Sequence, residues 1–361
     1  MRDTADYLDQ LKRHPAAMWL GFALVGAALA ALPFVVGLGG QTWVRIANLA
    51  LLYVMLALGL NIVVGFAGLL DLGYIAFYAV GAYSYALLAS PHFGLHLPFW
   101  IILPVGFLVA CVFGVLLGAP VLRLRGDYLA IVTLGFGEII RIFLNNLNAP
   151  VNITNGPQGI TLIDPVRLGS LSLATTERFA GLTFTGPVKY YYLLLVLVLV
   201  IIVINVRLQD SRIGRAWEAI REDEIAAQAM GINLRNIKLL AFAMGASFGG
   251  VAGGMFSAIQ GFISPESFGL FESIIVLTMV VLGGMGNIPG VILGAVLLSV
   301  FPEALRYMSP LQNAVFGREL IDAEAARLLI FGLAMVLIML FRPAGLLPSD
   351  VRKRELAMRS D

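Results

Sequence analysis

Long apolar runs alternate with short polar turns along most of this 361-residue chain. A helix needs about 20 mainly apolar residues to cross a bilayer, and several of the runs approach or reach that length. The pattern therefore predicts an all-α, multi-pass membrane fold with about ten transmembrane helices, within a range of eight to ten. The expected spans are 16–38, 43–64, 68–89, 98–122, 127–147, 190–206, 238–259, 272–288, 289–306 and 326–342.

The stretch 272–306 leaves two arrangements open. Its sequence GGMGNIPG, from Gly283 to Gly290, divides an apolar run into two pieces that are short for a full crossing. Irregular backbone at membrane depth is tolerated where protein encloses it or where it lines a cavity. The two pieces therefore form either two spans or a re-entrant pair.

The basic residues of the loops gather on one side of the membrane when the spans are counted from the N-terminus. Lys12 and Arg13 precede the first span, which places the N-terminus in the cytoplasm. The connection 148–189 then falls outside, and the basic loop 207–237 falls inside. The expected division is a cytoplasmic segment 1–15, a transmembrane domain 16–342 and a cytoplasmic tail 343–361.

The composition excludes a soluble domain. Hydrophobic residues make up 59% of the chain and charged residues 13%, whereas a soluble domain carries about a quarter charged residues. The chain contains no G-x-x-x-x-G-K-[ST] phosphate loop, no H-E-x-x-H pair and no cluster of Cys and His at metal-ligand spacing. We therefore expect no ATPase of its own, no cofactor and no metal, and the leading class is a transporter or channel subunit.

The stretch 212–238 is unusual because charges of both signs lie between Ala and Ile. Its spacing predicts two short helices joined by the acidic turn REDE. Asp223 stands where an N-cap would begin the second helix, and Gly231 where a left-handed residue would end it. The apolar face of the first helix comprises Ile213, Ala216, Trp217 and Ile220, and that of the second comprises Ile225, Ala226, Ala229 and Met230.

Two interpretations of this stretch remain open on its residues alone. It is either an amphipathic loop at the membrane surface or a helix that enters a groove of another protein. Membrane-surface helices usually pair a basic face with large apolar anchors, whereas this stretch offers small residues and mixed charge. The second interpretation is therefore favoured, with Glu224 in the first turn where it suits the helix dipole.

The segment EIAAQAMGIN, 224–233, resembles the EAA loop of ABC importer permeases, the cytoplasmic coupling helix that docks on the ATPase subunit. The match lies in Glu224, Ala226, Ala227 and Gly231, with Ile225 inserted between the Glu and the Ala pair. Five further stretches resemble the branched-chain amino-acid ABC importer permeases, in particular their M-type subunit. They are GLNIVVGFAGLLDLGYIAFYAVGAY (59–83), RGDYLAIVTLGFGEIIRIFLNN (125–146), TNGPQGI (154–160), GGMGNIPGVILGA (283–295) and FRPAGLLP (341–348).

This resemblance implies a permease subunit of an ATP-driven importer in the inner, cytoplasmic membrane. Its partners would be a second related permease chain, two cytoplasmic ATPase subunits and an external, periplasmic binding protein. The implied cargo is branched-chain, hydrophobic amino acids, but similar permeases are associated with urea, short amides and other small metabolites. The alternative from another class is an ion-coupled secondary transporter, for which Asp71 and Glu138 would be the membrane carboxylates.

Three groups of residues are candidates for function. The ATPase-coupling group is Glu218, Asp223, Glu224, Ala226, Ala227, Met230 and Gly231. The pathway or gate candidates are Asn61, Asp71, Glu138, Arg141, Gly283, Gly284 and Asn287. The candidates for contact with the binding protein are Asn155, Gly156, Pro157 and Gly159.

The last two groups also have structural interpretations. Glu138 and Arg141 are three residues apart on one helical face, and they form either a structural ion pair or part of a polar path. The glycines around Asp71 and in 283–290 either allow close helix packing or break helices that line the route. The turn signal of 154–159 is either a plain surface loop or part of a docking surface.

Overall fold

The computed structural model of the chain describes residues 15–37, 39–121, 124, 126–169, 171–179 and 182–306, with isolated positions between 329 and 347. The side chains of residues 15–24 lie outside this description. Most of the expected last span, 326–342, and nearly all of the expected terminal segments also lie outside the described residues, as do Lys12 and Arg13. The placement of both chain ends therefore stays a prediction.

The described residues are mostly helical. The α-helices are α2 (Pro15–Gly37), α3 (Gln41–Leu60), α4 (Ile75–Leu88), α5 (Phe99–Val121), α6 (Asp127–Asn146), α7 (Gly186–Gln209), α8 (Arg212–Glu222), α9 (Glu224–Ala229), α10 (Leu234–Gln260), α11 (Leu270–Gly283) and α12 (Ile288–Arg306). A π-helix, η1 (Asn61–Phe66), continues α3, and η2 (Gly156–Gln158) and η3 (Pro265–Phe268) are 3-10 turns. Two antiparallel hairpins pair β1 (Arg167–Leu168) with β2 (Leu171–Ser172), and β3 (Glu177–Phe179) with β4 (Leu182–Phe184).

Each expected span from 16–38 through 289–306 contains a helix. Five helical stretches among the described residues are long and apolar enough to cross a membrane, and α4 and α12 are shorter apolar helices. The five are Gln41–Phe66, Phe99–Val121, Gly186–Gln209, Leu234–Gln260 and Pro265–Gly283. An all-helical core is therefore confirmed, whereas the number of complete crossings stays a prediction.

The helix α4 begins later than the sequence pattern suggests. The expected span 68–89 contains seven non-helical residues, 68–74, before α4. Gly68 has a φ of +70°, which lies outside the helical region. Gly73 is pressed against the chain of α6, because a Cβ atom there would lie 2.0 Å from the carbonyl oxygen of Thr133. The apolar pattern therefore did not predict the turn at 68–74, which depends on packing against α6.

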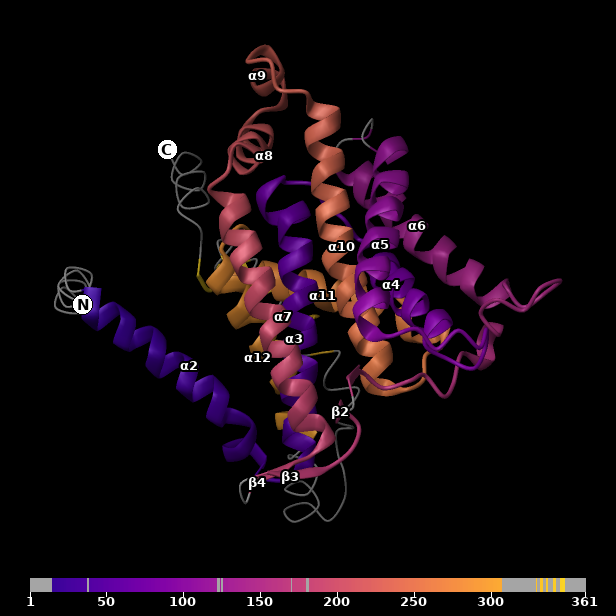
Figure 1. The fold of residues 1–361 in the computed structure, drawn as a ribbon. Coiled ribbons are helices and arrows are strands. Elements are labelled where there is room, and N and C mark those ends of the chain that lie inside the picture. Colours follow the sequence, from indigo (N-terminus) through magenta and orange to yellow (C-terminus); the bar gives the residue numbers. More distant parts are fainter. Residues whose placement is uncertain are drawn as a thin grey trace, which may run out of the picture.

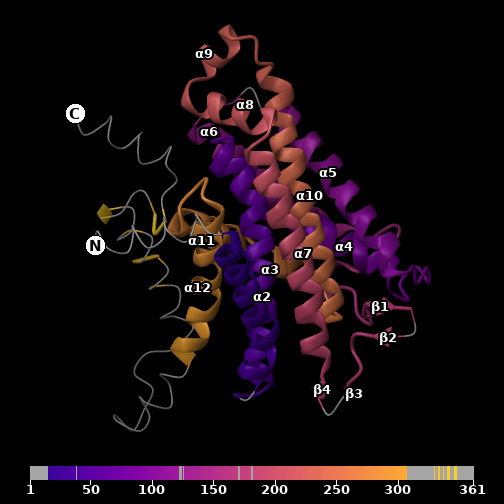
Figure 2. The same cartoon turned by 60° about the vertical axis from the view of Figure 1, so that its left-hand side comes forward.

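The centre of the bundle is α10, which packs against α3, α4 and α5 (Figures 1 and 2). Glycines allow this close approach: a Cβ atom on Gly81 would lie 2.0 Å from the carbonyl oxygen of Gly250. A Cβ atom on Gly253 would lie 2.0 Å from the carbonyl oxygen of Tyr78. Small residues let helices approach closely within a membrane, where the backbone contacts replace hydrophobic side-chain packing.

The bundle has two distinct ends. Figure 1 shows α8 and α9 at one end and the strands β3 and β4 at the other, joined by the long helix α7. The helix α10 then returns from the end that carries α9. The expected cytoplasmic loop 207–237 therefore forms one pole of the molecule.

Candidate coupling and gate region

The helix α8 is fixed to the bundle by its apolar face. Trp217 is fully buried and Ile220 is 2% exposed, so the apolar face expected for this helix is turned toward the rest of the chain. The indole nitrogen of Trp217 donates to the carbonyl oxygen of Ile237 in α10 over 2.8 Å. The side chain of Ser211 caps the start of α8 by accepting from two backbone amides. The first helix of the loop, α8, is thus attached to the bundle by burial and by a hydrogen bond to α10.

The helix α9 begins and ends where the sequence predicts. The carboxylate of Asp223 accepts from the backbone amides of Ile225 and Ala226 over 2.8 and 3.1 Å, as an N-cap does. Gly231 follows the helix with a φ of +86°, the conformation that glycine adopts most easily. Glu224 is paired with Lys238 of α10, with 2.5 Å between Oε1 and Nζ. Besides its position in the first turn of α9, Glu224 thus forms an ion pair that links α9 to α10.

The free surface of α9 is apolar at its tip. Ile225 is 71% exposed and Met230 is 84% exposed, and Ala226 is exposed between them. Ala227 points the other way and is only 3% exposed. Of the residues expected to couple to an ATPase, Ala227 therefore packs inside this chain. Glu218 lies on the exposed face of α8.

Arg221 joins α8 to the π-helix that continues α3. Its guanidinium donates to the carbonyl oxygen of Gly65 in η1. Gly68 lies directly beneath it, since a Cβ atom on Gly68 would be 2.8 Å from Cγ of Arg221. The two partners are 156 residues apart in the sequence, and no local pattern marks Arg221. Sequence reasoning missed this contact for that reason.

The π-helix in turn touches the glycine turn between α11 and α12. Asn61 is fully buried, and its Oδ1 accepts from the backbone amide of Gly286 over 2.9 Å. Gly65 also packs against Gly286, because a Cβ atom on Gly65 would lie 2.6 Å from the amide nitrogen of Gly286. A chain of direct contacts therefore runs from Arg221 through η1 to Gly286.

The glycine turn is tightly packed. Gly284 and Gly286 have φ values of +116° and +83°, which allow the sharp reversal between α11 and α12. A Cβ atom on Gly283 would lie 2.3 Å from the carbonyl oxygen of Gly290, so the two helices meet through their backbones. Close packing therefore explains Gly283, and turn geometry explains Gly284.

A short segment near the C-terminus closes this turn. The backbone amides of Leu346 and Leu347 donate to the carbonyl oxygens of Leu282 and Gly283 over 2.8 and 3.0 Å. The side-chain amide of Asn287 donates to the carbonyl oxygen of Leu347 over 2.8 Å. These bonds satisfy carbonyl groups that the end of α11 leaves without helical partners. The GLL residues of the FRPAGLLP stretch thus act as a cap.

Asp71 forms a local turn within the bundle. It is 1% exposed, and its Oδ1 accepts from the backbone amide of Gly73 over 2.9 Å. Its other carboxylate oxygen, Oδ2, is buried without a partner among the described residues. The backbone amide of Leu72 donates to the hydroxyl of Thr133, which ties the same turn to α6. A backbone amide therefore binds one oxygen of this buried carboxylate.

Glu138 and Arg141 form an ion pair on α6. Nε of Arg141 lies 3.1 Å from each carboxylate oxygen of Glu138. The same guanidinium lies 3.3 Å from Glu266, so the pair also connects α6 to η3, the turn before α11. Both side chains of the pair are partly exposed. Of the two interpretations left open by the sequence, this geometry favours the structural ion pair.

The loop 154–159 is fixed to the body of the protein. The Thr154 hydroxyl donates to the carbonyl oxygen of Leu144 over 2.6 Å, and the side-chain amide of Asn155 donates to that of Gly159 over 2.9 Å. Gly156 and Gly159 are buried, whereas Pro157 is exposed. Of the four residues expected to meet a binding protein, Pro157 and half-buried Asn155 are therefore the accessible ones.

The described residues hold no group of three or more His, Cys, Asp or Glu side chains arranged to bind a metal ion. What they do present is a set of long apolar helices with large apolar side chains on the outer faces of α5 and α7, among them Leu108, Val112 and Val203. Such faces suit contact with lipid chains. The fold and its polar end thus define a multi-pass membrane protein.

Comparison with known sequences gives the family. Residues 42–339 match the family described as branched-chain amino acid transport system / permease component. The high-affinity branched-chain amino acid transport system permease protein LivM of Escherichia coli is 49% identical over 88% of this chain and 72% of its own length. The chain belongs to this permease family.

More distant relatives carry related names. The permease protein LivH of Escherichia coli is 27% identical over 82% of this chain and 91% of its own length. A probable branched-chain amino acid transport permease protein LivM of Methanocaldococcus jannaschii is 27% identical over 75% of this chain and 74% of its length. No solved structure matches the chain.

Proposed function

We propose that this chain is the membrane-spanning permease subunit of an ATP-driven importer that carries branched-chain amino acids into the cytoplasm. The observation that carries the proposal is the apolar tip of α9. Ile225 and Met230 are 71% and 84% exposed there, at the end of the bundle that carries the charged loop. Exposed apolar side chains on a short helix at this pole fit insertion into a groove of a partner protein.

The contacts that attach α8 and α9 to α10 support a coupling role. Glu224 binds Lys238 of α10, and Trp217 binds the carbonyl oxygen of Ile237 at the start of the same helix. A displacement of α9 by an ATPase would therefore be passed to the central helix of the bundle. A loosely attached loop would absorb the same displacement.

The contacts of Arg221 connect α8 to the region that we propose as the gate. Movement of α8 would shift Gly65 in η1, and η1 is bonded through Asn61 to Gly286. We assign the gate to this junction of η1 with the glycine turn, including Gly283, Gly284 and Asn287. Its tight backbone packing suits a change between discrete arrangements, because packed contacts do not deform continuously. Asp71 and the pair of Glu138 with Arg141 are second candidates, as polar groups along the route.

The partners follow from the same reasoning and from the family. They are a second related permease chain, two cytoplasmic ATPase subunits and a periplasmic substrate-binding protein. The binding protein would meet the external side through Pro157 and Asn155, the accessible members of the fixed loop. The complex would lie in the inner membrane. Urea and short amides are the competing cargo within this class.

The test is reconstitution of the assembled importer in liposomes with labelled leucine. The chain alone should hydrolyse no ATP; hydrolysis should appear with the ATPases and the second permease, and rise further with loaded binding protein. A double variant, Ile225→Ser with Met230→Ser, should lose ATPase binding and uptake. The matched control is Val151→Ser, which removes an apolar side chain that is 64% exposed in the external connection.

Three results would overturn the proposal. Leucine uptake by this chain alone under a proton or sodium gradient would support the secondary transporter. Normal ATPase binding by the double variant would show that the tip of α9 is no docking surface. Uptake of urea or acetamide that an excess of leucine, isoleucine and valine leaves unchanged would reassign the cargo.

A further inference from the structure

A cavity of about 560 Å³ lies between α3, α7 and α10, at the end of the bundle opposite α9. Pockets that take small molecules have volumes of about 300–1,000 Å³. Its apolar lining comes from two helices, with Ile46, Leu49 and Leu52 on α3 and Phe256 and Ile259 on α10. The cavity therefore has the size and the apolar lining of a ligand site.

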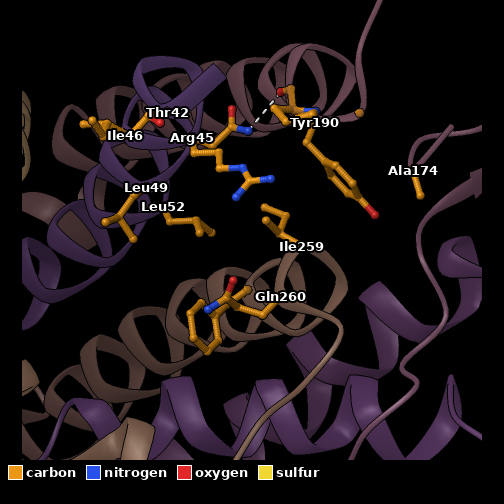
Figure 3. Close-up of a pocket in the computed structure, with 13 residues that line it drawn as sticks. Thr42, Arg45, Ile46, Leu49, Leu52, Ala174, Tyr190, Ile259 and Gln260 are labelled. Carbon is orange, nitrogen blue, oxygen red and sulfur yellow. Dashed lines mark hydrogen bonds between the residues drawn. The ribbon is translucent and has the colours of Figure 1, made fainter. Parts of the chain in front are cut away.

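Arg45 is the charged side chain of this cavity. Figure 3 shows its guanidinium reaching into the space enclosed by Leu52, Tyr190 and Ile259. The structure gives Arg45 no hydrogen bond or ion pair with any described residue, and the cavity wall contains no carboxylate. A guanidinium offers five donors in a planar fork that matches a carboxylate. Its binding capacity in this structure is therefore unused.

Hydrogen-bond acceptors also line the cavity. Asn48 is 3% exposed; its side-chain amide donates to the carbonyl oxygen of Pro187 over 2.9 Å, while its Oδ1 is buried with no partner among the described residues. Gln260 supplies a second side-chain amide to the wall. Gln260 is exposed and lines the cavity, so its side-chain oxygen is the acceptor that is open to a ligand.

We propose that this cavity binds an α-amino acid with a short apolar side chain. The carboxylate pairs with Arg45, the side-chain oxygen of Gln260 accepts from the ammonium group, and the side chain lies against Leu52 and Ile259. An anionic lipid shares the first and last of these interactions, but its phosphate makes no use of the acceptors. The inference rests on the proposed function and adds a binding site within a single permease subunit.

The test measures protection of a thiol in the cavity. The native Cys111 is first replaced by alanine, and Leu49→Cys then places the single thiol at a position that is 38% exposed. The assembled importer in nanodiscs is labelled with a maleimide. L-leucine should slow the labelling, whereas leucinamide, which lacks the carboxylate, should not. Ile46→Cys serves as a second position, and Leu108→Cys on the outer face of α5 should show no protection.

Arg45 variants identify the charge that matters. Arg45→Gln should raise the leucine concentration for half protection by about tenfold or more, as expected for loss of a charged hydrogen bond. Arg45→Lys, which keeps the positive charge, should raise that concentration less than Arg45→Gln does. Nanodiscs of phosphatidylcholine alone are compared with nanodiscs containing phosphatidylglycerol. Slow labelling that depends on phosphatidylglycerol and ignores leucine would assign the cavity to lipid.

The site and the importer function can fail separately. ATP-driven leucine uptake that is normal in Arg45→Gln, together with no protection by leucine, overturns the site and leaves the proposed function standing. Failure of the unaltered complex to transport leucine overturns the function whatever the labelling shows. Protection equal in Arg45→Gln and the unaltered chain refutes the role of Arg45.

Discussion

Replacing Gly231 with valine should weaken attachment of the ATPase while leaving the rest of the permease intact. Gly231 has a φ of +86°, and a Cβ atom built there would meet none of the described residues within 4 Å apart from its two neighbours in the chain. The cost of a side chain is therefore conformational and not steric within this chain. For an ordinary L-residue, the left-handed conformation costs about 1–2 kcal/mol, and β-branched residues suffer most.

In the free permease, the residues after α9 can shift to relieve this strain, so the fold itself should survive. Docking requires the original path of the chain, and the strain then opposes association. A cost of about 1–2 kcal/mol corresponds to about 5- to 30-fold weaker binding. Gly231→Asn should cost much less, about threefold or below, because Asn adopts the left-handed conformation more readily.

The assay titrates the ATPase subunit onto detergent-solubilised permease and measures leucine uptake in parallel. Equal amounts of each variant in the membrane are the condition for the comparison. Normal binding and uptake in Gly231→Val would refute the assignment of α9 as a coupling helix. A loss in Gly231→Asn as large as that in Gly231→Val would refute the conformational argument, because it would show a steric clash with the partner.

Two further predictions concern topology and packing. A reporter fused after Asn155 should be external and one after Asp210 cytoplasmic; the reverse result at either site would place α9 outside and end the coupling proposal. Gly81→Leu should abolish stable assembly, because its Cβ atom would lie 2.0 Å from the carbonyl oxygen of Gly250. Overpacking typically costs about 1–3 kcal/mol or more. Gly135→Leu, at a position open to its surroundings, should assemble normally, as measured by thermal unfolding of the purified protein.

The sequence alone predicted the features that depend on local chemistry. Apolar runs located a helix in each expected span through 289–306, because membrane helices must bury their backbone polar groups along their own length. Asp223 and Gly231 marked the ends of α9 through side-chain capping and backbone conformation, which neighbouring residues decide. The pairing of Glu138 with Arg141 followed from their spacing on one helix.

Other features were decided by tertiary structure, because they join residues far apart in the chain. No local pattern indicates that Arg221 binds Gly65, or that Asn61 binds Gly286. Ala227 lies on the buried side of α9, although its small side chain suits either surface. The turn before α4 and the cavity around Arg45 also arise where separate helices meet. A sequence pattern specifies which face of a helix is apolar, whereas the neighbour that covers it is fixed by packing.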